Sequence, residues 1–77
     1  MQKKKIIETL ERYNCEIGFI HHSQIAFRCH TEGFVISYDR DNKTYSLRKR
    51  GFNNYLCFNT SYSIFKKILI DCIESNI

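Results

Sequence analysis

The 77-residue sequence lacks proline and tryptophan, and it contains one alanine and three glycines. This composition excludes a collagen-like repeat and a disordered chain rich in proline and glycine. No apolar run approaches the ~20 residues that a transmembrane helix needs, so the sequence predicts no membrane association. The chain begins Met1-Gln2-Lys3-Lys4-Lys5 without an apolar segment, and we therefore expect no secretory signal. These absences predict a cytoplasmic protein.

The four cysteines form no CxxC pair; they are Cys15, Cys29, Cys57 and Cys72. In a cytoplasmic protein such thiols are expected to stay reduced, and free cysteine at an apolar position is usually buried. Structural zinc sites use closely spaced ligand pairs, which the sequence lacks. The adjacent Cys29 and His30 point to opposite faces of a strand and cannot share an ion. We therefore predict no disulfide, no metal site and no cofactor.

Hydrophobic residues make up 43% of the sequence and charged residues 26%, as is typical of a globular protein. The length allows one domain, spanning residues 1–77. A chain this short has little core from which to build a deep catalytic cleft. The paired carboxylates Asp39 and Asp41 belong to a sequence typical of a turn. No phosphate-binding glycine pattern and no cysteine nucleophile with an orienting partner is present. We predict a protein that is not an enzyme and has no catalytic residues.

The hydrophobic periodicity predicts a helix, several short strands and a second helix, in that order. Apolar residues recur at helical spacing over 3–14 and again over 64–73. From 17 to 58 they alternate with polar residues and are interrupted by turn sequences, which predicts four or five antiparallel strands. The expected fold is therefore α+β, a two-layer sandwich in which both helices cover one face of the sheet.

One sheet face is predicted to carry the core, and the other is predicted to stay open, as is normal for an antiparallel sheet covered on one side. The predicted core-facing residues are Ile17, Phe19, Ile25, Phe27, Cys29, Phe34, Ile36, Tyr45 and Leu47. The predicted open face carries Arg28, His30, Ser37, Thr44, Ser46, Arg48 and Arg50, with Ala26 and Val35 between them.

The positive charge is concentrated in one part of the chain. The net charge is +4, and residues 42–70 contain six basic side chains and no acidic one. Within this part, residues 48–55 interleave cations with aromatic rings and amides. We predict a partner-binding surface here, supported by two cations of the open sheet face. The candidate residues are Arg28, Lys43, Arg48, Lys49, Arg50, Phe52 and Tyr55.

Three interpretations of this surface stay open. Its arginines suit the carboxylates of an acidic protein or a ribonucleoprotein. Its cations, rings and amides also suit the phosphates and unpaired bases of nucleic acid. The third interpretation is a strand end that continues into a solvated loop without a partner.

The helix–strands–helix order is similar to that of double-stranded-RNA-binding domains, which bind through lysines at the start of the last helix. Here that helix opens with residues 61–65, Ser-Tyr-Ser-Ile-Phe, before Lys66 and Lys67, so the lysine pattern of that family is missing. Size and layout also resemble those of small phage-encoded inhibitors, including some anti-CRISPR proteins. Abundant Ile, Lys and Asn, which have AT-rich codons, agree with a phage or mobile-element origin.

These observations together predict a small non-enzymatic binding protein that acts as an inhibitor or adaptor. It would dock its basic-aromatic surface on a protein or ribonucleoprotein partner with an acidic surface. The alternative is a nucleic-acid-binding domain that uses the same surface.

Overall fold

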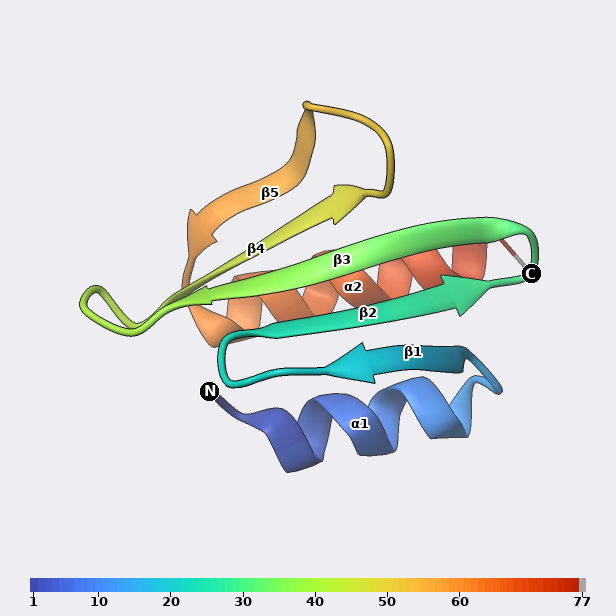
Figure 1. Cartoon of the computed structure of the whole chain (residues 1–77), viewed down its shortest axis with the longest axis horizontal. Helices are drawn as coiled ribbons and strands as arrows, with labels where there is room; N and C mark the ends of the chain where they lie inside the picture. Colours follow the sequence, from blue (N-terminus) through green and yellow to red (C-terminus); the bar gives the residue numbers. More distant parts are fainter. Residues whose placement is uncertain (77) are drawn as a thin grey trace.

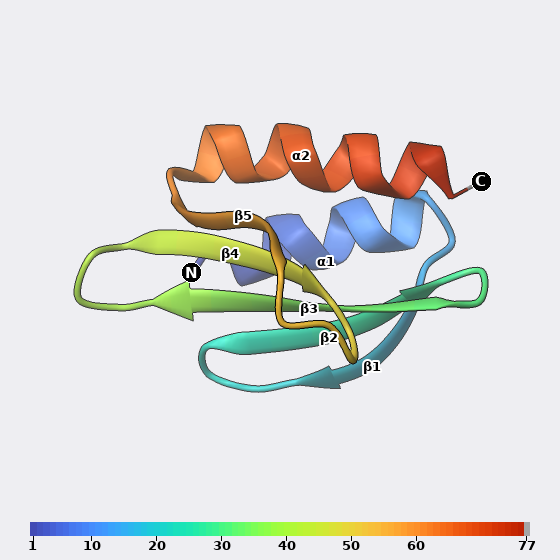
Figure 2. The ribbon, with the colours of Figure 1, turned by 90° about the horizontal axis from the view of Figure 1, so that it is seen from above.

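The computed structural model describes residues 1–76, in which seven elements follow one another. The strands form one antiparallel sheet in the order β1-β2-β3-β4-β5, and both helices lie on the same face of it (Figure 1, Figure 2). The predicted α+β architecture is confirmed, with five strands. The elements are α1 (Lys3–Arg12), β1 (Glu16–Ile20), β2 (Gln24–Cys29), β3 (Glu32–Asp39), β4 (Thr44–Lys49), β5 (Tyr55–Thr60) and α2 (Tyr62–Ser75).

The amphipathic helix α1 packs against the core with Ile6 and Leu10, which lie one turn apart and are buried. It ends in a Schellman motif. Asn14 adopts a left-handed conformation (φ 59°), which asparagine tolerates better than most residues. The Asn14 N–H donates to the Glu11 carbonyl (3.0 Å) and the Cys15 N–H to the Leu10 carbonyl (2.9 Å). This motif turns the chain from α1 into β1.

The helix α2 covers the sheet at β4 and β5. Phe65, Leu69 and Ile73 form its buried stripe at a spacing of four residues. Ser61 occupies the N-cap position in an extended conformation, but its hydroxyl makes no hydrogen bond to the backbone of the helix. Within residues 1–76 neither helix combines the length and the apolarity needed to cross a bilayer.

The core lies between the sheet and the two helices and forms one cluster of buried side chains. Tyr45 connects its parts. Its ring stacks on Phe65 of α2 at 4.9 Å between centroids, and its hydroxyl accepts a hydrogen bond from the Gln2 N–H at 2.7 Å.

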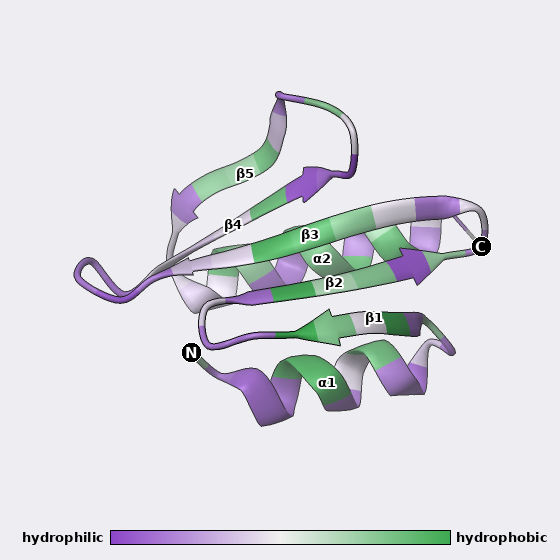
Figure 3. Cartoon of the chain, viewed as in Figure 1, coloured by the Kyte–Doolittle hydropathy of each residue, from purple (hydrophilic) through white to green (hydrophobic). Residues whose placement is uncertain are grey.

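Figure 3 shows apolar residues along the strands and helices, whereas the β3–β4 turn is hydrophilic. There the Asp39 carboxylate accepts hydrogen bonds from the Asp41 and Asn42 N–H groups, as the turn sequence predicts.

The prediction that Phe19 faces the core is wrong. The register of β1 against β2 shifts between Ile17 and Phe19, so that Ile17 pairs with Phe27 but Phe19 pairs with Ala26. The extra residue in this β-bulge is Gly18, and a bulge reverses the face on which the following side chains lie. Phe19 therefore lies on the open face, and its exposed fraction is 39%.

The edge strand β5 is bent by two irregularities in its pairing with β4. Asn59 has a left-handed conformation (φ 52°), and its N–H donates to the Ser46 hydroxyl at 3.0 Å. Cys57 remains buried in the core, whereas Tyr55 pairs with Arg48 on the open face. The bulges therefore place aromatic side chains of β5 where an unbroken alternation would not.

Candidate functional site

The sheet face opposite the helices is uncovered (Figure 2). Residues that pair directly in antiparallel strands share a face, so the register identifies which side chains lie on it. One row crosses all five strands and consists of Phe19, Ala26, Val35, Arg48 and Tyr55. An aromatic ring therefore stands at each edge of the sheet, with an arginine beside the small side chains between them.

A second row on this face contains Arg28, Gly33 and Arg50. Arg28 pairs with Gly33, and the Arg50 N–H donates to the Gly33 carbonyl at 2.8 Å. The Arg50 stem lies over the glycine, since a Cβ added to Gly33 would meet the Arg50 Cβ at 3.4 Å and Cδ at 3.5 Å. These three residues, with Glu16 and Gly18, help to line a hollow of about 410 Å³. The missing side chain at Gly33 leaves this hollow open between the two arginines.

Phe58 extends the surface along β5. Its ring centroid lies 4.8 Å from that of Tyr55, with the planes inclined at 55°, and its exposed fraction is 60%. The aromatic and basic side chains of this uncovered face are hereafter called the open-face patch. They are Phe19, Arg28, Arg48, Arg50, Tyr55 and Phe58.

The three arginines of the open-face patch have no carboxylate partner among residues 1–76. The ion pair in this part of the chain joins Lys49 and Glu32, at 3.0 Å. Glu16 is opposite Arg28 in the sheet and is the one acidic residue in the two rows, but the two side chains form no ion pair. The positive charge of the patch is therefore available to an external anion.

The structure separates the predicted binding residues into three places. Arg28, Arg48, Arg50 and Tyr55 lie together on the open face. Lys43, which we expected to support them there, lies in the β3–β4 turn with φ 56°, at the opposite end of β4 from Arg50. At about 3.3 Å per residue, the length of β4 separates Lys43 from Arg50 by roughly 23 Å.

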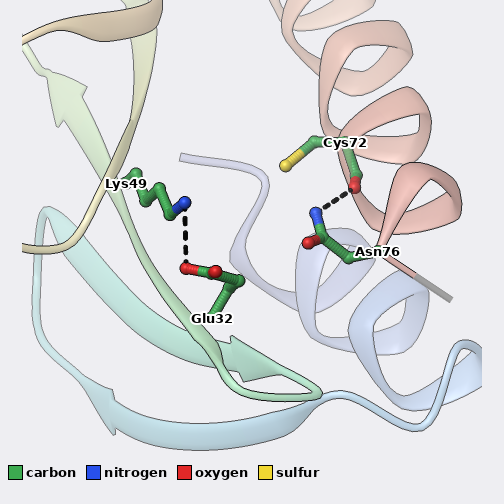
Figure 4. A network of polar contacts seen from close by, with 4 residues as sticks. All are labelled: Glu32, Lys49, Cys72 and Asn76. Carbon is green, nitrogen blue, oxygen red and sulfur yellow. Dashed lines mark hydrogen bonds and ion pairs between the residues drawn. The ribbon is translucent and has the colours of Figure 1, made fainter.

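Lys49 and Phe52 form the third group, in which Lys49 lies on the side of the sheet that carries α2 and Phe52 lies in the loop after β4. Successive side chains of a strand point to opposite faces, so Lys49 cannot share the face of Arg48 and Arg50. The Lys49 Nζ pairs with Glu32 and lies 5.2 Å from the centroid of the Phe52 ring. Figure 4 shows this ion pair next to Cys72 of α2. Both of these candidate side chains therefore already have partners within the chain.

Sequence reasoning missed Phe19 and Phe58 as surface residues. A signal for Phe19 was present, because a glycine inside an alternating strand often marks a bulge. Gly18 precedes Phe19 directly. For Phe58 the sequence offers no comparable signal, since the left-handed Asn59 beside it is recognised only in the structure.

All four cysteines are free, and three of them lie near one another at one end of the core. Burial raises the pKa of Cys15 from 9.0 to about 12, and the neighbouring Cys29 and Cys72 raise it further in the same direction. Burial and Cys29 raise the pKa of Cys72 to about 11, against the opposing effect of Lys49. Among residues 1–76, no three His, Cys, Asp or Glu side chains are arranged to hold a metal ion. Cys15 and Cys72 therefore stay protonated at neutral pH.

The raised thiol pKa values predict a loss of stability in alkali. The folded chain holds protons on Cys15 and Cys72 at pH values where the unfolded chain releases them, so folding becomes less favourable as the pH rises. The contribution of these two protonated thiols to the stability of the fold is fully present below pH 9 and is lost between about pH 9 and pH 12. We expect the urea midpoint to fall over this range in the parent chain and to fall less in a Cys15→Ala variant. An equal slope in both would contradict the assignment.

The open-face patch offers guanidinium groups that can hydrogen-bond to anions and exposed rings that can stack on planar groups. Comparison of the chain with protein-family models, with curated proteins and with solved structures finds no significant match.

Proposed function

We propose that this chain is a small non-enzymatic binding protein that docks its open-face patch on an acidic macromolecular partner, a protein or a ribonucleoprotein. In this role it acts as an inhibitor or adaptor, because it occupies a surface of the partner and carries out no reaction. Four free thiols suit the reducing conditions of the cytoplasm, where we propose that it works.

The observation that carries this proposal is the gathering of Arg28, Arg48 and Arg50 on one uncovered sheet face without ion pairs to residues 1–76. An arginine that is not already paired gives up less when it binds an external carboxylate or phosphate. The exposed rings of Phe19, Tyr55 and Phe58 border the same face, and aromatic residues with arginine are the types enriched in binding surfaces.

Affinity capture from the source cell, with and without nuclease, tests this proposal. The full chain serves as bait beside a variant carrying Arg28→Ala, Arg48→Ala and Arg50→Ala. We expect the arginine variant to lose at least about tenfold in affinity for the captured partner, since two or more charged contacts are removed.

The matched control removes three positive charges from the helices by Lys4→Ala, Lys66→Ala and Lys67→Ala. These lysines are exposed and lie in the layer away from the open face. We expect the control to bind within about threefold of the parent, because distant exposed charges are screened at physiological salt. Equal binding by the parent and the arginine variant would show that the open face is only a solvated surface.

A further inference from the structure

We infer that the acidic component contacted by the open-face patch is single-stranded nucleic acid, with phosphates on the arginines and bases stacked on the exposed rings. This inference rests on the proposed function, because it names the class of partner for the same surface. The experiments below distinguish failure of this inference from failure of the proposed function.

The rings of the patch are spaced for several bases instead of one. Phe19 and Tyr55 stand in one row on the outermost strands, β1 and β5. Neighbouring strands lie about 4.8 Å apart, so four strand spacings separate these rings by roughly 19 Å. Phe58 adds a third exposed ring next to Tyr55. Each ring can stack on any base, since every base has a π-face.

The arginines lie between the rings, where the backbone of a bound strand would cross the sheet. Arg48 shares the row of Phe19 and Tyr55, and Arg28 and Arg50 flank Gly33 in the next row. The hollow beside Gly33 gives a phosphate access to both arginines, and a guanidinium binds phosphate oxygens through two parallel hydrogen bonds. Glu16 and Glu32 also line this hollow and balance the charges of its two arginines. Glu32 is paired with Lys49, however, and Arg48 adds a third cation in the neighbouring row of the open face.

The shape of the surface argues against a duplex. A major groove about 12 Å wide admits a helix or a two-stranded ribbon. The five-stranded sheet is wider than this, at roughly 19 Å between its outer strands. Its rings therefore cannot reach paired bases inside a groove. They can stack only on bases that are already unpaired.

The placement of the rings favours nucleic acid over a protein partner. The aromatic anchors of a protein–protein interface cluster near its centre, in well-packed pockets. Here Phe19 and Tyr55 stand at the edges of the face, and the arginines lie between them. Cations between stacking rings are instead the usual composition of a surface for single strands.

Fluorescence anisotropy with a labelled 12-nucleotide DNA strand of mixed sequence, and with the same sequence as a duplex, tests this inference. Even fully stacked, 12 nucleotides span about 41 Å, which exceeds the longest dimension of the protein, 32 Å. We expect the full chain to bind the single strand at least tenfold more tightly than the duplex. Three phosphate contacts predict a slope of about −2 for log affinity against log salt concentration.

Two sets of variants separate the contribution of phosphate contacts from that of base stacking. The triple arginine variant should flatten the salt slope by about 2, whereas the triple lysine control should change it by less than about 0.5. A variant with Tyr55→Leu and Phe58→Leu keeps apolar bulk on β5 but removes two rings, so it should bind about tenfold more weakly or worse with an unchanged slope. The control Phe52→Leu removes an exposed ring outside the patch and should bind like the parent. Circular dichroism of each variant verifies folding.

The inference is overturned if the parent chain prefers the duplex, binds neither probe at low salt, or loses equal affinity in the patch and control variants. The proposed function has a separate outcome. Nuclease-resistant capture of a protein that depends on Arg28, Arg48 and Arg50 would refute nucleic acid as the partner while leaving the docking surface in place. Failure of both experiments would refute both proposals.

Discussion

Replacing Phe65 with alanine is expected to lower the free energy of unfolding by about 3–5 kcal/mol. Phe65 is fully buried in α2, and its ring stacks on Tyr45 at 4.9 Å and lies 6.2 Å from Tyr62. The truncation removes these contacts and leaves a cavity between α2 and the sheet. A 77-residue domain has a total stability of roughly 4–12 kcal/mol, so the variant would retain only a small margin. Urea unfolding followed by circular dichroism measures the change.

Phe58→Ala provides the matched control for this prediction. The same residue type is removed, but Phe58 is 60% exposed and its ring packs against that of Tyr55. We expect a loss below about 1 kcal/mol, which is the range of an exposed aromatic pair. A cost at Phe58 equal to that at Phe65 would mean that α2 does not seal the core as described.

The architecture was predictable because burial on one side imposes a simple period on each element. Ile6 and Leu10 of α1 and Phe65, Leu69 and Ile73 of α2 repeat at helical spacing, and all five are buried. The alternating strand residues likewise face the helices wherever the ladder is regular. Both helices must then cover the same face, because the alternate positions of β2, β3 and β4 carry charged, polar or small side chains instead of large apolar ones.

The composition of the binding surface was less predictable, because a surface depends on the register of every strand. The consecutive residues Arg48, Lys49 and Arg50 look like one basic cluster in the sequence. Because successive side chains of a strand point to opposite faces, Arg48 and Arg50 lie on the open face, whereas Lys49 forms an ion pair with Glu32 on the other face. Phe19 changes face because one extra residue, Gly18, enters the ladder. Hydrophobicity specifies which residues can be buried, but local backbone geometry decides where the exposed ones gather.

This separation also changes how the binding experiments should be designed. A variant that removes Arg48, Lys49 and Arg50 together would delete two residues of the patch and one internal ion pair. Its effect on binding would therefore be mixed with a loss of contacts between β4 and the start of β3. A variant that replaces Arg28, instead of Lys49, together with Arg48 and Arg50 removes the same number of positive charges. It also confines the change to one face of the sheet.

The half-buried thiols of Cys15 and Cys72 should react far more slowly in the folded chain than in the unfolded one. Only the thiolate attacks an alkylating reagent, and at pH 8 a pKa raised from 9.0 to about 12 lowers the thiolate fraction of Cys15 by about 1,000-fold. For Cys72, with a pKa of about 11, the reduction is about 100-fold. A more basic thiolate is also a better nucleophile, with a Brønsted coefficient of about 0.4–0.5, and this recovers part of the loss. The expected net slowing is thus at least about 30-fold for Cys15 and about tenfold for Cys72.

Iodoacetamide labelling at pH 8, resolved by residue with mass spectrometry, measures these rates in native buffer and in urea. A Ser63→Cys variant supplies the internal standard, because position 63 is exposed on α2 and its thiol should react alike in both conditions. The rates at Cys15 and Cys72 should rise with pH up to about 11–12, beyond the value at which the exposed thiol levels off. If native Cys15 instead reacts as fast as the thiol at position 63, the end of the core where α1 meets α2 is open to solvent. The stability lost in alkali and the suppressed alkylation would then both disappear, since they share one cause: these thiols are protected from water.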